Sequence, residues 1–138
     1  MTDARKNLKA LIVEDDDDTA KLISKVLHKA GMISSIGYNG AMGLKLFIEE
    51  KPDIVFSNFI MPEKGGVWLF HEIRSLDYKV PVILFSGRYW ELNRKFDREP
   101  IKPNYMLKKP FSVMQIYEIL QECFPESMFS IGFEELPV

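Results

Sequence analysis

Residues 8–31, LKALIVEDDDDTAKLISKVLHKAG, contain the pattern that decides the fold. They begin with a short apolar run, continue through an acidic block over 14–18, and pass into a stretch with apolar residues at helical spacing. Those apolar residues are Leu22, Ile23, Val26, Leu27 and Ala30. Because glycine commonly stops a helix, Gly31 marks its end. The segment therefore predicts one strand followed by one amphipathic helix, with possible N-caps from Asp16 to Thr19.

The same order of strand and helix repeats along the rest of the chain. Further strands are expected over 32–36, 53–57, 82–85 and 105–107. Further helices are expected between Gly40 and Pro52, over 66–76, over 88–98 with a poor pattern, and over 112–123. Apolar strands that alternate with amphipathic helices predict an α/β fold, a doubly wound five-stranded parallel sheet with helices on both faces.

Composition excludes several classes of protein. The chain has 138 residues, 46% of them apolar, which suits one compact domain. A net charge of −2 gives no basic field, so we expect no direct binding of nucleic acid. No apolar run approaches the ~20 residues that span a bilayer, and the start MTDARKNLKA lacks the core of a signal peptide. A single cysteine, Cys123, excludes an internal disulfide and favours a reducing, cytoplasmic setting without a membrane.

Polar residues follow the predicted strands where ligand sites of such folds lie. Glu14 and Asp15 follow the first strand, Asn58 the third, Ser86 the fourth and Lys109 the fifth. Paired carboxylates suit Mg²⁺, while a hydroxyl and an ammonium suit a phosphoryl group. The set therefore favours phosphoryl transfer to a protein side chain. It disfavours a flavin- or nucleotide-binding protein, because no glycine-rich phosphate loop follows the first strand.

Four segments in this order carry a resemblance to a known family: LKALIVEDDDDTAKLISKVLHKAGM, KPDIVFSNFIMPEKGGVWLFHEIR, VPVILFSG and YMLKKPFS. They resemble the receiver domain of response regulators in two-component signalling. The resemblance implies a flavodoxin-like receiver fold, similar to that of chemotaxis regulators. It covers about residues 8–124, which leaves 1–7 as an N-terminal extension and 125–138 as a C-terminal tail.

The resemblance also assigns roles to the residues at the strand ends. Asn58 stands where the family has its phospho-accepting aspartate. Ser86 and Lys109 match the residues that contact the phosphoryl group, and the Lys109–Pro110 bond is expected to be cis. The implied Mg²⁺ ligands are Glu14, Asp15, Asn58 and the carbonyl of Ile60.

Asn58 is the departure that matters for function. An amide cannot form the mixed anhydride of an aspartyl phosphate, so we expect self-phosphorylation to be blocked and no enzymatic activity. Loss of one negative charge also leaves Mg²⁺ binding weakened or absent. We expect a pseudo-receiver that acts by protein–protein contact with a sensor histidine kinase, another signalling protein, or an output domain on another chain. The alternative is a phosphorelay-competent, Mg²⁺-dependent receiver in which Asn58 is an engineered or recent substitution.

Smaller departures affect the signalling surface. Gly65 stands where the family usually has aspartate, and Met106 where it often has a switching aromatic residue. Tyr105, next to Met106, is expected on the opposite side of its strand. Pro100 and Pro103 are expected to alter the fourth helix and the partner surface beside it.

Three further residues are expected to take no part in the chemistry. Ser57 adjoins Asn58 but faces away through strand alternation, and His28 and His71 lie on helices away from the strand ends.

Overall fold

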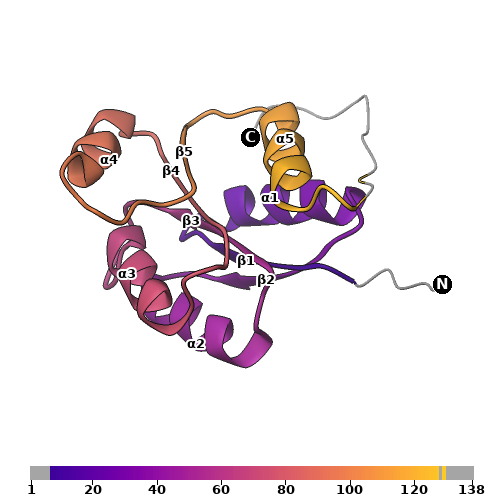
Figure 1. Cartoon of the computed structure of the whole chain (residues 1–138), viewed down its shortest axis with the longest axis horizontal. Helices are drawn as coiled ribbons and strands as arrows, with labels where there is room; N and C mark the ends of the chain where they lie inside the picture. Colours follow the sequence, from indigo (N-terminus) through magenta and orange to yellow (C-terminus); the bar gives the residue numbers. More distant parts are fainter. Residues whose placement is uncertain (1–6, 128, 130–138) are drawn as a thin grey trace.

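The computed structural model describes residues 7–127 and 129. Within them, five parallel strands form one sheet in the order β2-β1-β3-β4-β5 (Figure 1). The strands are β1 (Lys9–Val13), β2 (Ile33–Gly37), β3 (Ile54–Asn58), β4 (Val82–Ser86) and β5 (Tyr105–Lys108). The helices are α1 (Asp17–Lys29), α2 (Gly40–Glu50), α3 (Gly66–Leu76), α4 (Tyr89–Phe96) and α5 (Val113–Cys123). The predicted doubly wound α/β fold is confirmed, while most of the predicted extension (1–7) and tail (125–138) lies outside the described residues.

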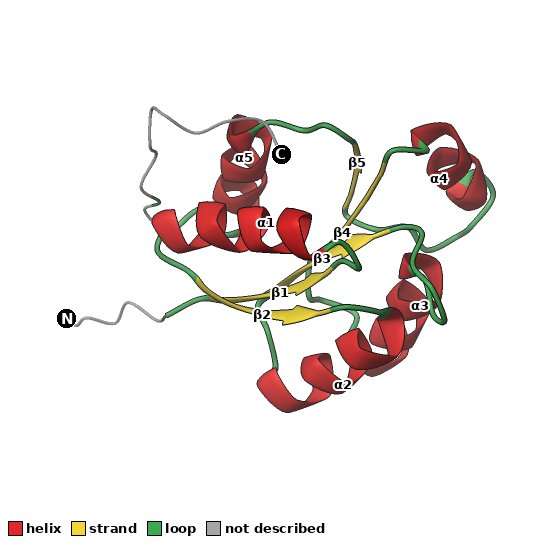
Figure 2. Ribbon diagram, turned by 180° about the vertical axis from the view of Figure 1, so that it is seen from behind, coloured by secondary structure: helices red, strands yellow, loops and turns green. Residues whose placement is uncertain are grey.

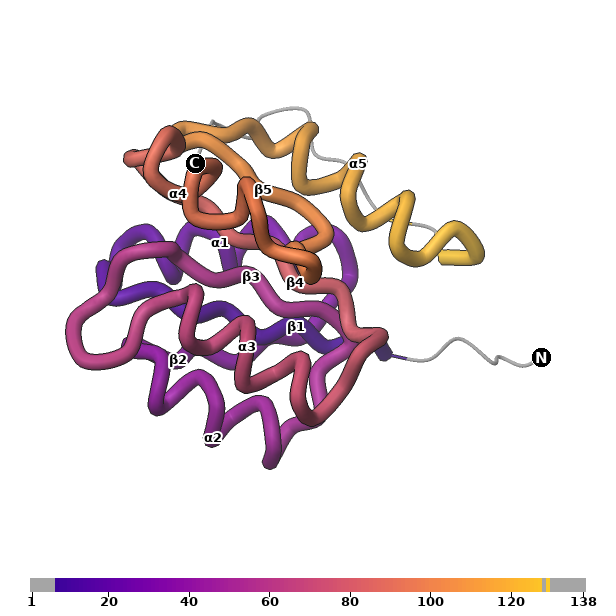
Figure 3. The backbone as a smooth tube through the Cα atoms, turned by 60° about the vertical axis from the view of Figure 1, so that its left-hand side comes forward, coloured from indigo at the N-terminus to yellow at the C-terminus, as the bar shows by residue number. Residues whose placement is uncertain are grey.

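Two hydrophobic clusters hold the helices on opposite faces of the sheet. Because side chains alternate along a strand, Ile12 and Phe56 point toward α1 and α5, whereas Leu11 and Val55 point toward α3 and α4. Figure 2 shows α1 and α5 on one side of the sheet and α2 and α3 on the other, and the tube of Figure 3 shows the same division from a second direction. The central strands are therefore apolar on both faces, as the sequence predicted for 82–85.

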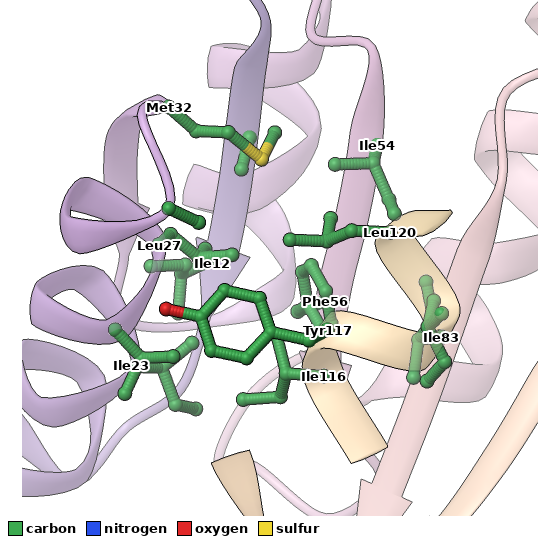
Figure 4. Close-up of a cluster of buried hydrophobic side chains, with 14 of the residues drawn as sticks. Ile12, Ile23, Leu27, Met32, Ile54, Phe56, Ile83, Ile116, Tyr117 and Leu120 are labelled. Atoms are coloured by element: carbon green, nitrogen blue, oxygen red, sulfur yellow. The ribbon is translucent and has the colours of Figure 1, made fainter. Parts of the chain in front are cut away.

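The cluster beneath α1 and α5 is made of side chains from these two helices and from the strands. Figure 4 shows Ile23 and Leu27 of α1 and Ile116 and Leu120 of α5 grouped around the strand residue Ile12. All five side chains are fully buried. Leu22, expected on the apolar face of this helix, is instead 39% exposed because it lies at the edge of the packed stripe.

The local signals for helix ends act as the residue types suggest. Asp16 caps α1 by accepting a hydrogen bond from the backbone N–H of Thr19, and Gly31 ends the helix with a φ of +101°. The third helix has its predicted bounds, β2 begins one residue later than expected, and α4 is shorter than the predicted 88–98. None of the helices in the described part of the chain is long and apolar enough to cross a membrane.

Candidate functional site

The carboxyl ends of β1 and β3 lie side by side at the edge of the sheet where all five parallel strands end. The strand order reverses direction between these two strands, and in open parallel sheets such a switch point is the place where ligands bind. Glu14 and Asp15 directly follow β1, and Asn58 is the last residue of β3. Lys109 follows β5 and reaches back across the edge to Glu14. The fold thus brings together four residues that are up to 95 positions apart in the sequence.

Glu14 is the buried acid of the site. Its side chain is 1% exposed, and its Oε1 pairs with the Lys109 ammonium at 2.9 Å. Burial raises the pKa of Glu14, and the hydrogen bond from Lys109 opposes that rise. The Lys109 side chain is 27% exposed, and its ammonium also lies 5.2 Å from the centre of the Phe85 ring. The positive charge of Lys109 is therefore directed at Glu14, and it also makes a cation–π contact with the Phe85 ring.

The Asn58 side chain lies among the oxygens of its neighbours. Its Nδ2 donates to Glu14 Oε2 at 3.0 Å and to the Ile60 carbonyl at 3.1 Å, and it approaches Asp15 Oδ1 at 3.4 Å. Its Oδ1 accepts from the backbone N–H of Phe59 at 3.0 Å. The chemistry of the partners fixes this orientation, because a flipped amide would set oxygen against oxygen and N–H against N–H.

The same residues can be tested as ligands of Mg²⁺. Carboxylates and carbonyls are the ligand types that this cation prefers. However, the groups of Glu14, Asp15 and Ile60 that would bind it all face the amide nitrogen of Asn58, while the Asn58 oxygen is turned to Phe59. The residue types are suitable for a hard cation, but their arrangement does not fit one.

Ser86 lies at the same edge, but its side chain belongs to a different feature. It is buried, and its Oγ accepts a hydrogen bond from the backbone N–H of Arg88 at 2.8 Å. This bond shapes the turn from β4 into α4, a common use of serine. The backbone carbonyl of Ser86 accepts from the Lys109 N–H at 2.9 Å, so the two residues are neighbours through the main chain.

The loop after β3 holds the Asn58 backbone in place. The N–H of Gly66 donates to the Phe59 carbonyl at 2.9 Å. A Cβ atom on Gly66 would lie 2.3 Å from the carbonyl oxygen of Asn58, so this close approach requires glycine. The Lys109–Pro110 peptide bond is cis, as the family resemblance implies.

Of the residues expected outside the chemistry, Ser57 adjoins this cluster through the main chain of Asn58, and the two histidines lie on helices. Ser57 is fully buried and donates its hydroxyl proton to the Asn58 carbonyl. His28 and His71 are exposed on α1 and α3.

The two neighbours on β5 separate as strand alternation predicts. Tyr105 packs against the cluster beneath α1 and α5, and its hydroxyl donates to Glu122 of α5. Met106 packs against the opposite cluster, on the side of α3 and α4. Position 106, where the family resemblance leads us to expect a switching aromatic residue, carries this methionine.

Sequence reasoning missed three contributors to the site. Phe85 supports Lys109, the backbone N–H of Phe59 orients Asn58, and the backbone N–H of Arg88 holds Ser86. A serine followed by glycine signals a turn and could have predicted the last contact. The first two have no sequence signal, because they depend on how side chains from separate strands meet.

Comparison with known proteins places these observations in context. The family described as "Response regulator receiver domain" matches residues 10–121. "Regulatory protein AtoC" of Escherichia coli (strain K12) is 30% identical over 111 residues, which are 80% of this chain and 24% of that protein. "Transcriptional regulatory protein RprY" of Bacteroides fragilis (strain YCH46) is 28% identical over 88 residues, which are 64% of this chain and 37% of that protein. The matched part of this chain thus spans only 24% to 37% of the length of these curated relatives.

Solved structures show the same fold. A CheY-like response regulator receiver domain protein from Methanospirillum hungatei JF-1 superposes with a TM-score of 0.80 at 20% identity, covering 88% of this chain and 96% of that one. A sensor protein from Polaromonas sp. JS666 superposes with a TM-score of 0.78 at 23% identity, covering 88% of this chain and 98% of that one.

Proposed function

This chain belongs to the family of response regulator receiver domains of two-component systems, and from that premise we propose that it is a pseudo-receiver. A pseudo-receiver signals by protein–protein contact and does not accept a phosphoryl group. The observation that carries the proposal is Asn58 at the end of β3, hydrogen-bonded to Glu14 and close to Asp15. A phosphoryl acceptor of this kind needs a carboxylate oxygen as nucleophile, and the amide supplies none.

Two neighbouring side chains, Ser57 and Glu14, are poor substitutes for the missing acceptor. Ser57 is fully buried, with its hydroxyl directed to a backbone carbonyl. Glu14 is a carboxylate, but it is buried and paired with Lys109. Asp15 is exposed, and mapping of any label must therefore distinguish it from position 58.

The remaining family residues take altered roles in this proposal. Lys109 compensates the charge of Glu14, and Ser86 shapes the start of α4. Mg²⁺ binding is weakened or absent, because the third carboxylate of the family pattern is an amide here. The contact partner is a sensor histidine kinase, another signalling protein, or an output domain on another chain. A cytoplasmic location is proposed from the single cysteine, which suits a reducing compartment.

The test is to incubate the full chain with Mg²⁺ and acetyl phosphate and to measure its intact mass. We expect the unmodified protein to gain no phosphoryl group. Asn58→Asp restores the carboxylate at position 58 for comparison, and Asn39→Asp is the matched control because it adds the same charge in the loop after β2. An alkali-labile phosphoryl group on the unmodified chain, mapped to residues 14–15 or 57–58, would contradict the proposal.

A second candidate is a receiver whose machinery is intact apart from Asn58. The observation in its favour is that Glu14, Asp15, Ser86 and Lys109 all lie at the same edge of the sheet. Stoichiometric phosphorylation of Asn58→Asp would support this candidate. A failure of that variant to accept phosphate would instead indicate that the contacts of Ser86 and Lys109 in this chain also matter.

A further inference from the structure

The Asn58 amide nitrogen occupies the centre of a group of oxygen atoms. Glu14 Oε2, the Ile60 carbonyl and Asp15 Oδ1 lie 3.0, 3.1 and 3.4 Å from it. These are the oxygens that would have to turn toward a divalent cation. An amide NH₂ has two donor hydrogens, which satisfy Glu14 and the Ile60 carbonyl, and its partial positive charge also faces Asp15, so it meets acceptors that otherwise need a cation or water.

We propose that the Asn58 amide takes the place of the divalent cation, so that this site is completed without metal. The inference deepens the proposed pseudo-receiver function, on which it rests, because it removes metal as a regulator of the same site. Glu14 is paired with the Lys109 ammonium, and the neutral Asn58 amide lies beside both Glu14 and Asp15, where it adds donors without adding charge. An aspartate at position 58 would instead place a third carboxylate beside Glu14 and Asp15, and cation binding would then relieve their repulsion.

Entry of a cation into the unmodified site would break the existing contacts. The amide would have to turn its oxygen inward, which breaks the hydrogen bonds to Glu14 and Ile60 and the bond from the Phe59 N–H. Nothing among these contacts replaces the lost donors, and the new ligand would be a neutral oxygen. Mg²⁺ gives up its water ligands reluctantly, so this exchange is unfavourable.

The experiment compares thermal unfolding of the full chain with EDTA and with MgCl₂ at constant ionic strength. A ligand that binds only the folded state raises Tm, so Tm reports the cation directly. We expect no Mg²⁺-dependent change in Tm for the unmodified protein. Asn58→Asp should unfold at a lower Tm in EDTA than the unmodified protein, and its Tm should rise by several degrees in Mg²⁺. Asn39→Asp, which adds the same charge at the N-cap of α2, should not respond to Mg²⁺.

A second measurement needs no variant to fold. Mn²⁺ is paramagnetic and broadens the NMR signals of nearby amides, so it can be titrated into ¹⁵N-labelled unmodified protein. We expect no selective broadening at residues 14–15 and 58–60, and we expect the Asn58 side-chain NH₂ to exchange slowly with solvent. Selective broadening there, or a rise in Tm with Mg²⁺ as large as that of Asn58→Asp, would overturn the inference. If the unmodified chain binds metal but is not phosphorylated, this inference fails and the pseudo-receiver proposal stands. If the chain is phosphorylated but its stability does not depend on metal, the pseudo-receiver proposal is the one that fails.

Discussion

Replacing Lys109 by methionine tests how the buried acid is kept ionised. The substitution retains most of the apolar length of the side chain but removes the ammonium that pairs with Glu14 at 2.9 Å. Glu14 is 1% exposed, so water cannot replace that partner without a change in structure. We therefore expect Lys109→Met to destabilise the folded protein at neutral pH.

The magnitude follows from what remains around Glu14. Removal of one partner from a fully buried ion pair costs about 3–5 kcal/mol, because a charge is left buried and unpaired. Here Lys109 is 27% exposed, and Glu14 keeps hydrogen bonds from Asn58 and from the Asp16 backbone. Those contacts reduce the expected loss to about 2–3 kcal/mol in the free energy of unfolding at pH 7.

The loss in the free energy of unfolding caused by Lys109→Met should also depend on pH. The pKa of Glu14 is already raised above 4.5 by burial, and Lys109 is one of the groups that oppose the rise. Without Lys109 the pKa of Glu14 rises further. A carboxyl pKa that is higher in the folded state than its ordinary value of 4.5 stabilises the folded protein below pH 4.5. This contribution is lost as the pH rises through the folded-state pKa. The loss caused by Lys109→Met should therefore be smaller at pH 4 than at pH 7.

Urea unfolding at the two pH values measures both effects. Lys108→Met is the matched control, because Lys108 is an exposed neighbour on β5, and its substitution should change stability by less than about 0.5 kcal/mol. Glu14→Gln in the Lys109→Met background should recover part of the loss, since it removes the unpaired charge. A loss no larger than that of Lys108→Met, or one that does not shrink at low pH, would refute the reasoning.

Three other predictions concern single contacts elsewhere in the fold. Gly66→Ala should destabilise the fold by about 1–3 kcal/mol in urea unfolding, because its Cβ would lie 2.3 Å from the Asn58 carbonyl oxygen; an unchanged midpoint would be inconsistent with this contact. The pKa of Tyr105 is raised to about 12 by its hydrogen bond to Glu122, so the stability that this bond contributes is present below 10 and is lost as the pH rises through about 12. Alkaline titration of tyrosine absorbance should show this group, and Glu122→Gln should return it toward 10; equal titration curves would count against the bond. Ser112→Ala removes the capping box of α5 and should cost about 1 kcal/mol in urea unfolding, whereas Ser75→Ala, near the end of α3, should cost less.

The sequence was sufficient for the order of elements and for the edge that carries the site. Short apolar runs such as 82–85 are buried on both faces, and helical periodicity separates α1 and α5 from the strands. Once the strands are parallel, Glu14 and Asn58 must lie at the same edge, since both follow or end a strand.

The orientation of side chains at that edge was beyond sequence reasoning. Whether Asn58 turns its nitrogen or its oxygen toward Glu14 depends on the Phe59 N–H and the Ile60 carbonyl, which only the folded loop brings into place. The sequence places Ser86 at the end of a strand, but it does not indicate that its hydroxyl accepts from the backbone N–H of Arg88. Such choices depend on backbone atoms, and residue types alone do not encode them.

The most direct measurement is the phosphoryl content of the unmodified chain beside Asn58→Asp after equal treatment with Mg²⁺ and acetyl phosphate. We predict none on the unmodified chain, because position 58 offers an amide where the reaction needs a carboxylate. One alkali-labile phosphoryl group per unmodified molecule would contradict the central claim.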